Sequence, residues 1–460
     1  MTDQRPDIDP DDDDFAPSRA VIADISDALD RGDGDRLDAL LEPLHAADIA
    51  DLIEQLGPQR RRELLRLYSG EIDGEILAEI DESIREEVVE QLPRDVLADA
   101  VREMDTDDVV DLLEDLEGPE RETVLAALDD PDRVAVEQSL TYPEYSAGRL
   151  MQSEVVTAPE HWTVGETIDH LRTEEVLPDQ FYHVILVDPR RHPIGYVTLG
   201  RLLSSQRATR LRDIVEDSFR TIDVLQEEGD VAYAFNQYHL ISAPVVDAHG
   251  RLVGVITMDD AMSVLDEEHE EDFLRLAGVG PENSLSDGVV DTVRRRAPWL
   301  LVNLLTANVS AFVISRFSGT IEAIVALAAL MPIVASMGGN AGTQSLAVAV
   351  RALATKDLTR SNAGRVVWRE TVVGLVNGLL FAVIMGLVGY LAYGSAALGW
   401  VLAAALVINL LVAALGGVMV PLTLERMGLD PALAAGTFVT TLTDVIGFLA
   451  FLGLATWVLI

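Results

Sequence analysis

Apolar residues recur at every third or fourth position from residue 20 to residue 147. This spacing predicts helices throughout the range, with Pro and Gly residues marking the turns between them. The segment DIADLIEQL, which begins at Asp48, matches DVVDLLEDL, which begins at Asp108, at an offset of 60 residues. Such repetition is typical of stacked helical hairpins. We therefore predict an all-α superhelical N-terminal domain, preceded by an acidic, disordered tail over residues 1–19.

The pattern changes over residues 148–265, where short β-rich runs alternate with helical stretches in an order that occurs twice. The first copy contains FYHVILVD and PIGYVTL, and the second contains SAPVVDAHGRLVGVITM. Two α/β modules are therefore predicted, over residues 148–206 and 207–265. The second copy resembles the closing half of a CBS module in PVVDAHGRLVGVITMDDAM, and VILVDPRRHPIGYVTLGRL is a weaker copy of it. The pair is thus similar to a tandem CBS domain.

Residues 266–296 are predicted to connect these soluble domains to a membrane domain. The segment LDEEHEEDFLRL predicts a helix that is acidic on nearly every side, and Gly278–Gly288 follows as a linker that contains Gly, Pro and Ser. Three arginines, Arg294–Arg296, end just before Pro298. They mark the point at which the long uncharged stretches begin.

The rest of the chain, residues 297–460, is predicted to form a five-helix transmembrane domain. Its stretches without charge, apart from Asp444, are 297–315, 323–350, 371–424 and 431–460. A span needs about 20 residues, so the stretch 371–424 must hold two helices, broken near Tyr393–Gly399. Three arginines precede the first span and a basic cluster separates the second span from the third, so both groups fall on one side of the membrane. By the positive-inside bias the acidic domains are cytoplasmic, and five spans place the C-terminus outside.

The formal net charge of −43 is confined to the soluble part, because residues 297–460 carry six acids and seven bases. A soluble part with 71 acids and 27 bases is not a nucleic-acid binder by electrostatic attraction. Lys356 is the only lysine against 33 arginines, a pattern associated with proteins that work in very high salt. On such a surface a cluster of carboxylates carries less information about metal binding. The chain has no cysteine, which excludes disulfides and thiolate metal sites.

Asp444 is the only charged residue between Pro431 and Ile460. An Asp at the centre of a membrane helix costs about 2.5–3.5 kcal/mol, so an intramembrane carboxylate is a functional-site hypothesis by default. Asp444 lies 13 residues after Pro431, about 20 Å along a helix. We predict that it lines a cation path. The alternative is a protonated or Arg-paired carboxylate that holds helices together, although no arginine lies inside any predicted span.

The second predicted span contains Pro332 and then Gly338–Gly342, with the sequence GGNAG. One interpretation is a broken helix that lines the ion path through Gly338, Gly339 and Asn340, because discontinuous spans recur at ion pathways. The other is close helix packing through small residues. In the last span the hydroxyls of four threonines either hydrate a passing ion or bond back to helix carbonyls. They are Thr437, Thr440, Thr441 and Thr443.

The order of acidic helical array, tandem CBS pair, acidic connector and five spans, with GGNAGTQS and DPALAAGTFVTTLTDVIG, resembles the MgtE-type magnesium channels over nearly the whole chain. The resemblance implies a homodimer whose pore follows the subunit interface, and it matches the family's selectivity aspartate to Asp444. It also implies cytosolic domains that bind several Mg²⁺ ions and close the pore through the connecting helix. Mg²⁺ keeps several waters, so a carboxylate that binds the hydrated ion suits it.

The resemblance also implies regulatory Mg²⁺ ligands in the soluble part. They are Asp107, Asp111, Asp260, Glu268, Glu271, Asp272 and Asp430. Two other sensor positions are occupied by His239 and Gly229, which implies that some sites are missing or replaced. In CBS modules a Gly-x-Ile-Thr-x-x-Asp pattern holds ribose, and Gly254, Thr257 and Asp260 match it. The first copy has Arg201 in place of the aspartate, so at most one good site for ATP is implied.

The predicted function is a homodimeric, Mg²⁺-selective channel of the cytoplasmic membrane that is gated by intracellular Mg²⁺. No nucleophile–base set, P-loop or HExxH motif is present, so no catalytic activity is predicted. One alternative is a membrane-anchored CBS nucleotide sensor, for which five spans are more than an anchor needs. The other is a secondary divalent-cation exchanger. It is disfavoured because the chain has a single intramembrane aspartate and no detectable inverted repeat.

Overall fold

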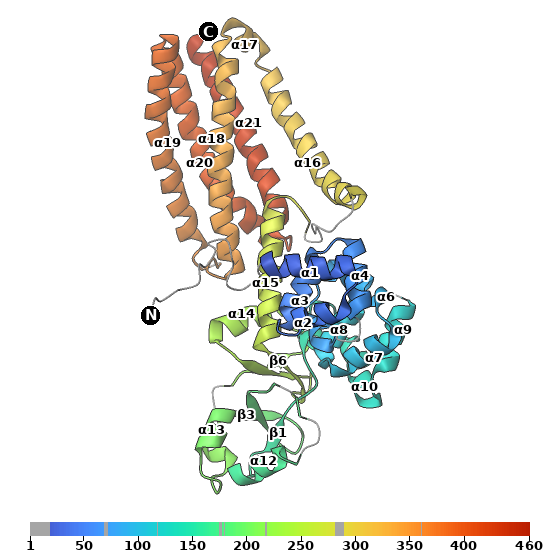
Figure 1. The fold of residues 1–460 in the computed structure, drawn as a ribbon. Helices are drawn as coiled ribbons and strands as arrows, with labels where there is room; N and C mark the ends of the chain where they lie inside the picture. The colour runs from blue at the N-terminus through green and yellow to red at the C-terminus, as the bar shows by residue number, and fades with distance from the viewer. Residues whose placement is uncertain are drawn as a thin grey trace, which may run out of the picture. The chain divides into compact units, whose positions relative to one another are not determined.

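The computed structural model describes residues 19–460 except 69–71, 117, 174–176, 179, 217–218, 281–288 and 360. The chain divides into two compact units, residues 1–265 and residues 266–460 (Figure 1). Almost all of the predicted acidic tail, and residues 281–288 of the predicted linker Gly278–Gly288, lie outside the described residues.

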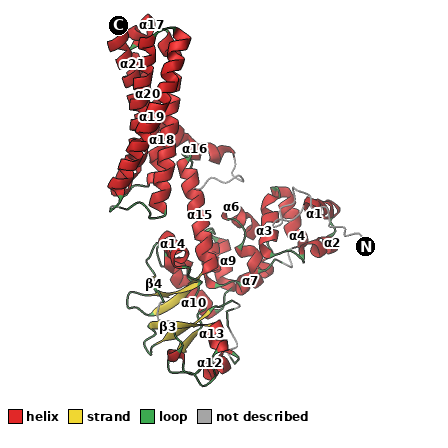
Figure 2. Cartoon of the chain, turned by 90° about the vertical axis from the view of Figure 1, so that its left-hand side faces the viewer, coloured by secondary structure: helices red, strands yellow, loops and turns green. Residues whose placement is uncertain are grey.

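Short helices follow one another through the first part of the first unit, which confirms the predicted helical array (Figure 2). Asp33, Asp73 and Asp81 each cap a helix by accepting a hydrogen bond from a backbone N–H in its first turn, so several of the acids stabilise helix ends. The helices are α1 (Arg19–Arg31), α2 (Gly34–Leu41), α3 (Ala46–Gln55), α4 (Pro58–Tyr68), α5 (Gly74–Ala78), α6 (Glu82–Gln91), α7 (Arg94–Glu103), α8 (Thr106–Glu114), α9 (Pro119–Ala127) and α10 (Asp130–Ser139).

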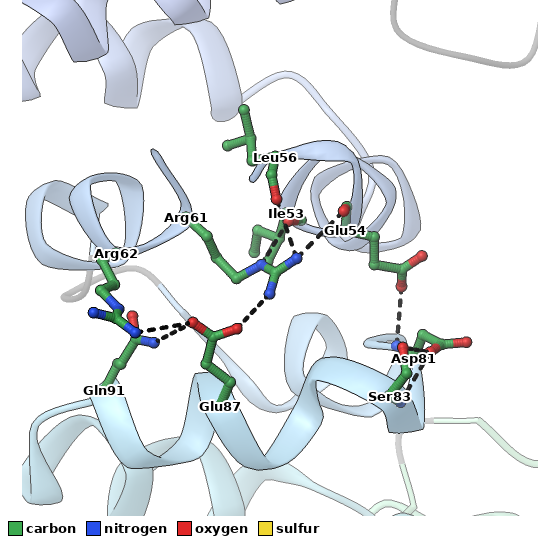
Figure 3. A network of polar contacts seen from close by, with 9 residues as sticks. All are labelled: Ile53, Glu54, Leu56, Arg61, Arg62, Asp81, Ser83, Glu87 and Gln91. Atoms are coloured by element: carbon green, nitrogen blue, oxygen red, sulfur yellow. Dashed lines mark hydrogen bonds and ion pairs between the residues drawn. The ribbon is translucent and has the colours of Figure 1, made fainter. Parts of the chain in front are cut away.

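Arg61 is buried between α3, α4 and α6, where it joins three helices (Figure 3). Its Nε donates to the carbonyl oxygen of Ile53 at 3.0 Å, and its Nη2 donates to that of Leu56 at 3.1 Å. Both carbonyls lie at the C-terminal end of α3, where backbone carbonyls have no hydrogen-bond donor within the helix. Nη1 pairs with Glu87 of α6 at 2.7 Å. One side chain therefore caps its neighbouring helix and ties it to the next hairpin.

Arg85 repeats this arrangement 24 residues later. Its Nε donates to the carbonyl oxygen of Ile80 at 3.0 Å, just after α5 ends, and its Nη1 lies 2.8 Å from Asp111 and 2.7 Å from Asp115. Arg61 and Arg85 each pair with an acid 26 residues further along the chain. The array thus uses the same buried arginine, paired with an acid of a following helix, twice.

Two three-stranded sheets follow, and both combine one parallel and one antiparallel pair, in the orders β1-β2-β3 and β4-β5-β6. The irregularity at Leu186/Val187 in β2 recurs at Val245/Val246 in β5, which confirms the predicted duplication. The elements are α11 (Ala147–Leu150), β1 (Thr157–Pro159), α12 (Val164–Leu171), β2 (His183–Val187), β3 (Pro193–Thr198), α13 (Leu199–Ser204), a 3₁₀ turn (Leu211–Asp213), β4 (Ile222–Asp223), α14 (Glu228–Tyr238), β5 (Ser242–Val246), β6 (Leu252–Thr257) and α15 (Met258–Leu276).

The second unit is helical. Four helices of its described part are long and apolar enough to cross a membrane by length and composition, namely those over Thr292–Ser315, Ala363–Tyr393, Ala396–Arg426 and Ala435–Leu459. The turn between the third and fourth predicted spans lies at Gly394, in the left-handed conformation, within the predicted range. The helices are α16 (Val289–Ser315), α17 (Ser318–Ala323), α18 (Ala326–Ala354), α19 (Ala363–Tyr393), α20 (Ala396–Arg426) and α21 (Pro431–Leu459).

The helix α18 is continuous through Pro332 and Gly338–Gly342, so of the two interpretations of this segment the broken helix is wrong. The glycines serve helix packing instead. A Cβ added at Gly342 would lie 2.6 Å from Val439 of α21, and one at Gly417 of α20 would lie 2.8 Å from the carbonyl oxygen of Gly342. Without side chains at these positions, the three helices approach closely while α18 keeps its backbone hydrogen bonds.

Candidate ion pathway and regulatory carboxylates

Asp444 lies near the middle of α21, a 29-residue helix that begins at Pro431. The side chain of Asp430 caps this helix, because its Oδ1 accepts a hydrogen bond from the backbone N–H of Ala432 at 2.7 Å. Asp444 itself is half-buried, and within the described residues its carboxylate has neither an ion pair nor a hydrogen bond. The alternative of an Arg-paired structural carboxylate therefore finds no partner there.

The threonine hydroxyls around Asp444 are already engaged. Thr440 Oγ1 donates to the carbonyl oxygen of Gly436 at 2.9 Å, and Thr441 Oγ1 donates to that of Thr437 at 2.7 Å. Thr443 is fully buried. Thr443 Oγ1 donates to the carbonyl oxygen of Thr440 at 2.9 Å, whereas Thr437 Oγ1 donates to Asn303 Oδ1 at 2.9 Å. Bonding back to helix carbonyls is thus found for three of the four threonines, and the hydroxyl oxygens of Thr440 and Thr441 can still accept a hydrogen bond from a hydrated ion.

The three residues of α18 that were predicted to line the pore lie on different sides of the helix. Gly338 is buried and lies against Asn409 of α20, so helix packing accounts for it. No atom lies within 4 Å of a Cβ built at Gly339, and Asn340 is exposed with its Nδ2 3.4 Å from Ser336 Oγ. Gly339 and Asn340 therefore remain predictions for the pore, whereas Gly338 belongs to the helix interface.

Three carboxylates meet between α8 and the first turn of α15 in the first unit. Asp107 is 9 % exposed and is hydrogen-bonded to Asp260, which also accepts from the backbone N–H of Thr257 at 3.3 Å. Burial, with the nearby charge of Asp260, raises the pKa of Asp107 well above its usual value. Burial also raises the pKa of Asp108 to about 7 and the pKa of Asp260 to about 6. Burial and mutual repulsion therefore favour the protonated carboxyls in this cluster when no cation neutralises their charge.

Asp111 lies one turn after Asp107 but is bound differently. Its carboxylate is mostly exposed and pairs with the buried guanidinium of Arg85 at 2.8 Å. A cation at Asp111 must therefore compete with Arg85. Sequence reasoning missed Arg85, and the signal was its position 24 residues after Arg61 in a repeating array.

A second group of carboxylates lies in the second unit, where the end of α15 meets the start of α21. Arg275 lies 2.7 Å from Glu271 and 3.1 Å from Asp430, so it links the two helices. Burial raises the pKa of Asp272, and the nearby Asp430 raises it further. Burial, more than the charge of any neighbour, also raises the pKa of Glu271. The structure thus brings together three predicted ligands, while Glu268 lies on an exposed part of α15.

The predicted nucleotide ligands lie at one edge of the second sheet, and only one of them faces a cleft. Thr257 lines a shallow cleft that is open to solvent, together with Gln152, Tyr182, His183 and Ser242. Burial lowers the pKa of His183, so the neutral imidazole is favoured.

The other two predicted nucleotide ligands are used within the protein. A Cβ at Gly254 would lie 2.8 Å from the carbonyl oxygen of Gln152, so glycine is required there for chain packing. Asp260 is bound to Thr257 and Asp107. The cleft was not predicted, because His183 and Ser242 lie 59 residues apart in different modules.

In the described ranges, no group of three or more His, Cys, Asp or Glu side chains is arranged to hold a metal ion directly. The carboxylate pairs are nevertheless suited to Mg²⁺, which usually keeps several waters and is bound through one or two carboxylates. The chain joins long apolar helices to two α/β modules and an acidic helical array, and one of these helices carries an aspartate that has no partner among the described residues. These features define a membrane cation transporter with a large soluble part.

Family comparisons agree with this class. A model described as a divalent cation transporter, MgtE, matches residues 331–454, the MgtE intracellular N domain matches residues 44–145, and CBS domains match residues 147–207 and 212–267. The magnesium transporter MgtE of Bacillus subtilis is 30% identical over 317 residues, which are 69% of this chain and 70% of that protein. The chain belongs to the MgtE family of magnesium transporters, which are not enzymes.

Two further proteins are similar to parts of this chain. The magnesium transporter MgtE of Thermus thermophilus is 35% identical over 317 residues, which are 68% of this chain and 70% of that protein. Among solved structures, the cytosolic domain of the Mg²⁺ channel MgtE in complex with ATP is 27% identical. The match covers 53% of this chain and 99% of the chain in that structure, with a TM-score of 0.49.

Proposed function

We propose that this chain forms a homodimeric Mg²⁺ channel of the cytoplasmic membrane, with the soluble domains inside the cell and the C-terminus outside. Asp444 of each protomer then binds the hydrated ion at the pore axis. Two carboxylates that face each other without a cation repel, and a divalent ion relieves this repulsion better than Na⁺ or K⁺ does.

We also propose that intracellular Mg²⁺ closes this channel. The observation that carries the proposal is the cluster of Asp107, Asp108 and Asp260, in which buried carboxylates from two domains meet with raised pKa values. A divalent cation between them stabilises the contact between the helical array and the second CBS module. The carboxylates of Glu271, Asp272 and Asp430 offer a second place for the ion, in which it competes with Arg275. Asp111 and the exposed Glu268 belong to the same proposal.

The test is ion flux in proteoliposomes as a function of Mg²⁺ on the side of the soluble domains. We expect influx down a Mg²⁺ gradient without any counter-ion, and a decrease as Mg²⁺ on that side rises into the millimolar range. Molar KCl should not replace Mg²⁺, because screening alone does not bridge carboxylates. Flux that requires an opposing proton or Na⁺ gradient would favour the exchanger, and no flux with intact nucleotide binding would favour the anchored sensor.

The cleft lined by Thr257, Tyr182 and His183 supports a role for ATP as an additional ligand of the CBS pair. Tyr182 offers a ring to stack on the base, and the neutral His183 carries no charge to discriminate among nucleotides. Because Asp260 is committed to Asp107, we expect one ATP per protomer whose binding is insensitive to Asp260→Asn and weakened about tenfold by Tyr182→Ala. Calorimetry on the full chain checks this. Binding that disappears in Asp260→Asn would restore the ribose role of that carboxylate.

A further inference from the structure

Asn409 is a polar side chain in the interior of the second unit that neither the ion path nor the regulatory carboxylates use. It lies on α20 and is fully buried, with 0 % exposure. Its Nδ2 donates a hydrogen bond to the carbonyl oxygen of Val334 on α18 at 2.8 Å. Within the described residues, its Oδ1 has no hydrogen-bond partner. A buried amide that is only half satisfied calls for a physical reason.

Two glycines on different helices make room for this amide. A Cβ built at Gly338 of α18 would lie 2.2 Å from Asn409 Nδ2, and one built at Gly447 of α21 would lie 2.7 Å from the same atom. No Cβ occupies such positions in real structures, so an alanine at either site would displace the amide or the helix. Asn409 is therefore held between α18 and α21 and contacts both.

Gly447 lies three residues after Asp444, which is less than one helical turn. The buried residues on this side of α21 continue with Thr443, one turn earlier, whose Cγ2 lies 3.6 Å from a Cβ built at Gly342 of α18. The contact with Asn409 thus fixes α21 at the level of its carboxylate. Any rotation or sliding of α21 there moves Asp444.

Packing alone does not account for an amide at this position. A buried acceptor without a partner costs about 1–3 kcal/mol, and a leucine, which branches at the same atom, would avoid that cost. What leucine lacks is a donor for the carbonyl of Val334. That hydrogen bond forms in only one register of α18 against α20. Apolar packing alone specifies this register less strictly.

We propose that Asn409 is a positioning residue for ion selection, which locks α18, α20 and α21 in the register that presents Asp444 to the ion. The inference rests on the proposed role of Asp444. Asn409 does not contact the ion itself. It acts through Gly447, by fixing the height and rotation of the helix that carries the carboxylate.

The test is the ratio of Mg²⁺ flux to K⁺ flux in proteoliposomes, measured on protein that is folded and has the wild-type oligomeric state. We expect Asn409→Leu to keep or raise the melting temperature, because it removes an unsatisfied polar group, and to lower the flux ratio about fivefold, which is the effect of losing one hydrogen bond. A purely structural residue would change the melting temperature without changing the ratio. An unchanged ratio in Asn409→Leu therefore overturns the proposal.

A second set of variants keeps the proposal testable if Asn409→Leu does not fold. Gly447→Ala should lower the flux ratio because the new methyl group meets the amide. Asn409→Ala removes the amide, so the double variant Asn409→Ala/Gly447→Ala has room for that methyl group. We expect it to fold but to keep a lowered ratio, since the hydrogen bond to Val334 is still absent. A wild-type ratio in the double variant overturns the proposal.

The matched control is Gly453→Ala on the same helix, where no atom lies within 4 Å of the added Cβ. It should leave the flux ratio unchanged. The flux ratio of Asp444→Asn shows whether a failure concerns the pore role of Asp444 or the positioning role of Asn409. If Asp444→Asn keeps the wild-type ratio, the proposed role of Asp444 is wrong. If Asp444→Asn loses selectivity while both Asn409 variants keep it, only the positioning role is wrong.

Discussion

Asp444→Asn is expected to abolish the preference for Mg²⁺ over monovalent cations. The substitution keeps the size of the side chain and removes the one carboxylate in the interior of α21. Hydrogen bonds to a charged group contribute about 1.5–3 kcal/mol each, so losing one from each protomer lowers the ratio of Mg²⁺ to K⁺ flux by about 100-fold or more. Asp444→Ala should behave similarly, because the loss of charge dominates.

The measurement is flux of both ions in proteoliposomes, with the oligomeric state of the variant checked by light scattering. Glu322→Gln is a matched control, since it removes the same charge from an exposed position on α17. A variant at Asp444 that keeps the wild-type ratio would show that the ion is selected elsewhere. The assignment of the pore carboxylate would then have to be given up.

The double variant Asp107→Asn/Asp260→Asn is expected to remove the response of the soluble domains to Mg²⁺ and to weaken their response to pH. Both carboxyls, together with Asp108, have pKa values that are raised when α8 lies against α15. The domain contact therefore binds protons more tightly than the separated domains do. Protonation of these carboxyls therefore stabilises the domain contact fully at low pH, and this stabilisation is lost as the pH rises through about 6 to 7.

Without divalent cations, protection of α8 from hydrogen exchange in the full-length protein should fall between about pH 5 and pH 8. Millimolar Mg²⁺ should restore the protection at the upper end of this range, because the ion replaces the protons. In the double variant the protection should be independent of Mg²⁺, and its remaining pH dependence should come from Asp108 alone. Asp95→Asn on the exposed side of α7 is the control and should respond as the wild type does. A double variant whose α8 is still protected by Mg²⁺ would place the sensor elsewhere.

Much of the architecture was predictable because it depends on local periodicity. The helical spacing around Asp48 and Asp108 predicted α3 and α8, which begin 60 residues apart. The repeated alternation after residue 148 predicted two modules whose sheets have the same strand order. The uncharged stretches predicted the long helices and the turn at Gly394. Asp444 was also found from the sequence, because a lone charge in a long apolar segment is visible without knowing what surrounds it.

The second span shows where this reasoning failed. Gly338–Gly342 and Pro332 suggested a broken helix, since glycine and proline weaken an isolated helix. The choice between a break and close packing depends on what lies opposite, and here Val439 and Asn409 fill the space that the missing side chains leave. Neighbouring helices therefore stabilise a continuous α18, and a single segment of sequence contains no record of those neighbours.

The sequence by itself determined the order of the domains, the length of the helices and the position of the intramembrane carboxylate, because each follows from composition and spacing within one segment. Only the tertiary structure decided which carboxylates have partners. Arg85 pairs with Asp111, which lies 26 positions further along the chain. Arg275 links the end of α15 to Asp430, which lies beyond α20 in the sequence. Asp107 meets Asp260, which belongs to another domain. Electrostatic energies depend on distance and burial in space, and residues far apart in the chain acquire both only when it folds.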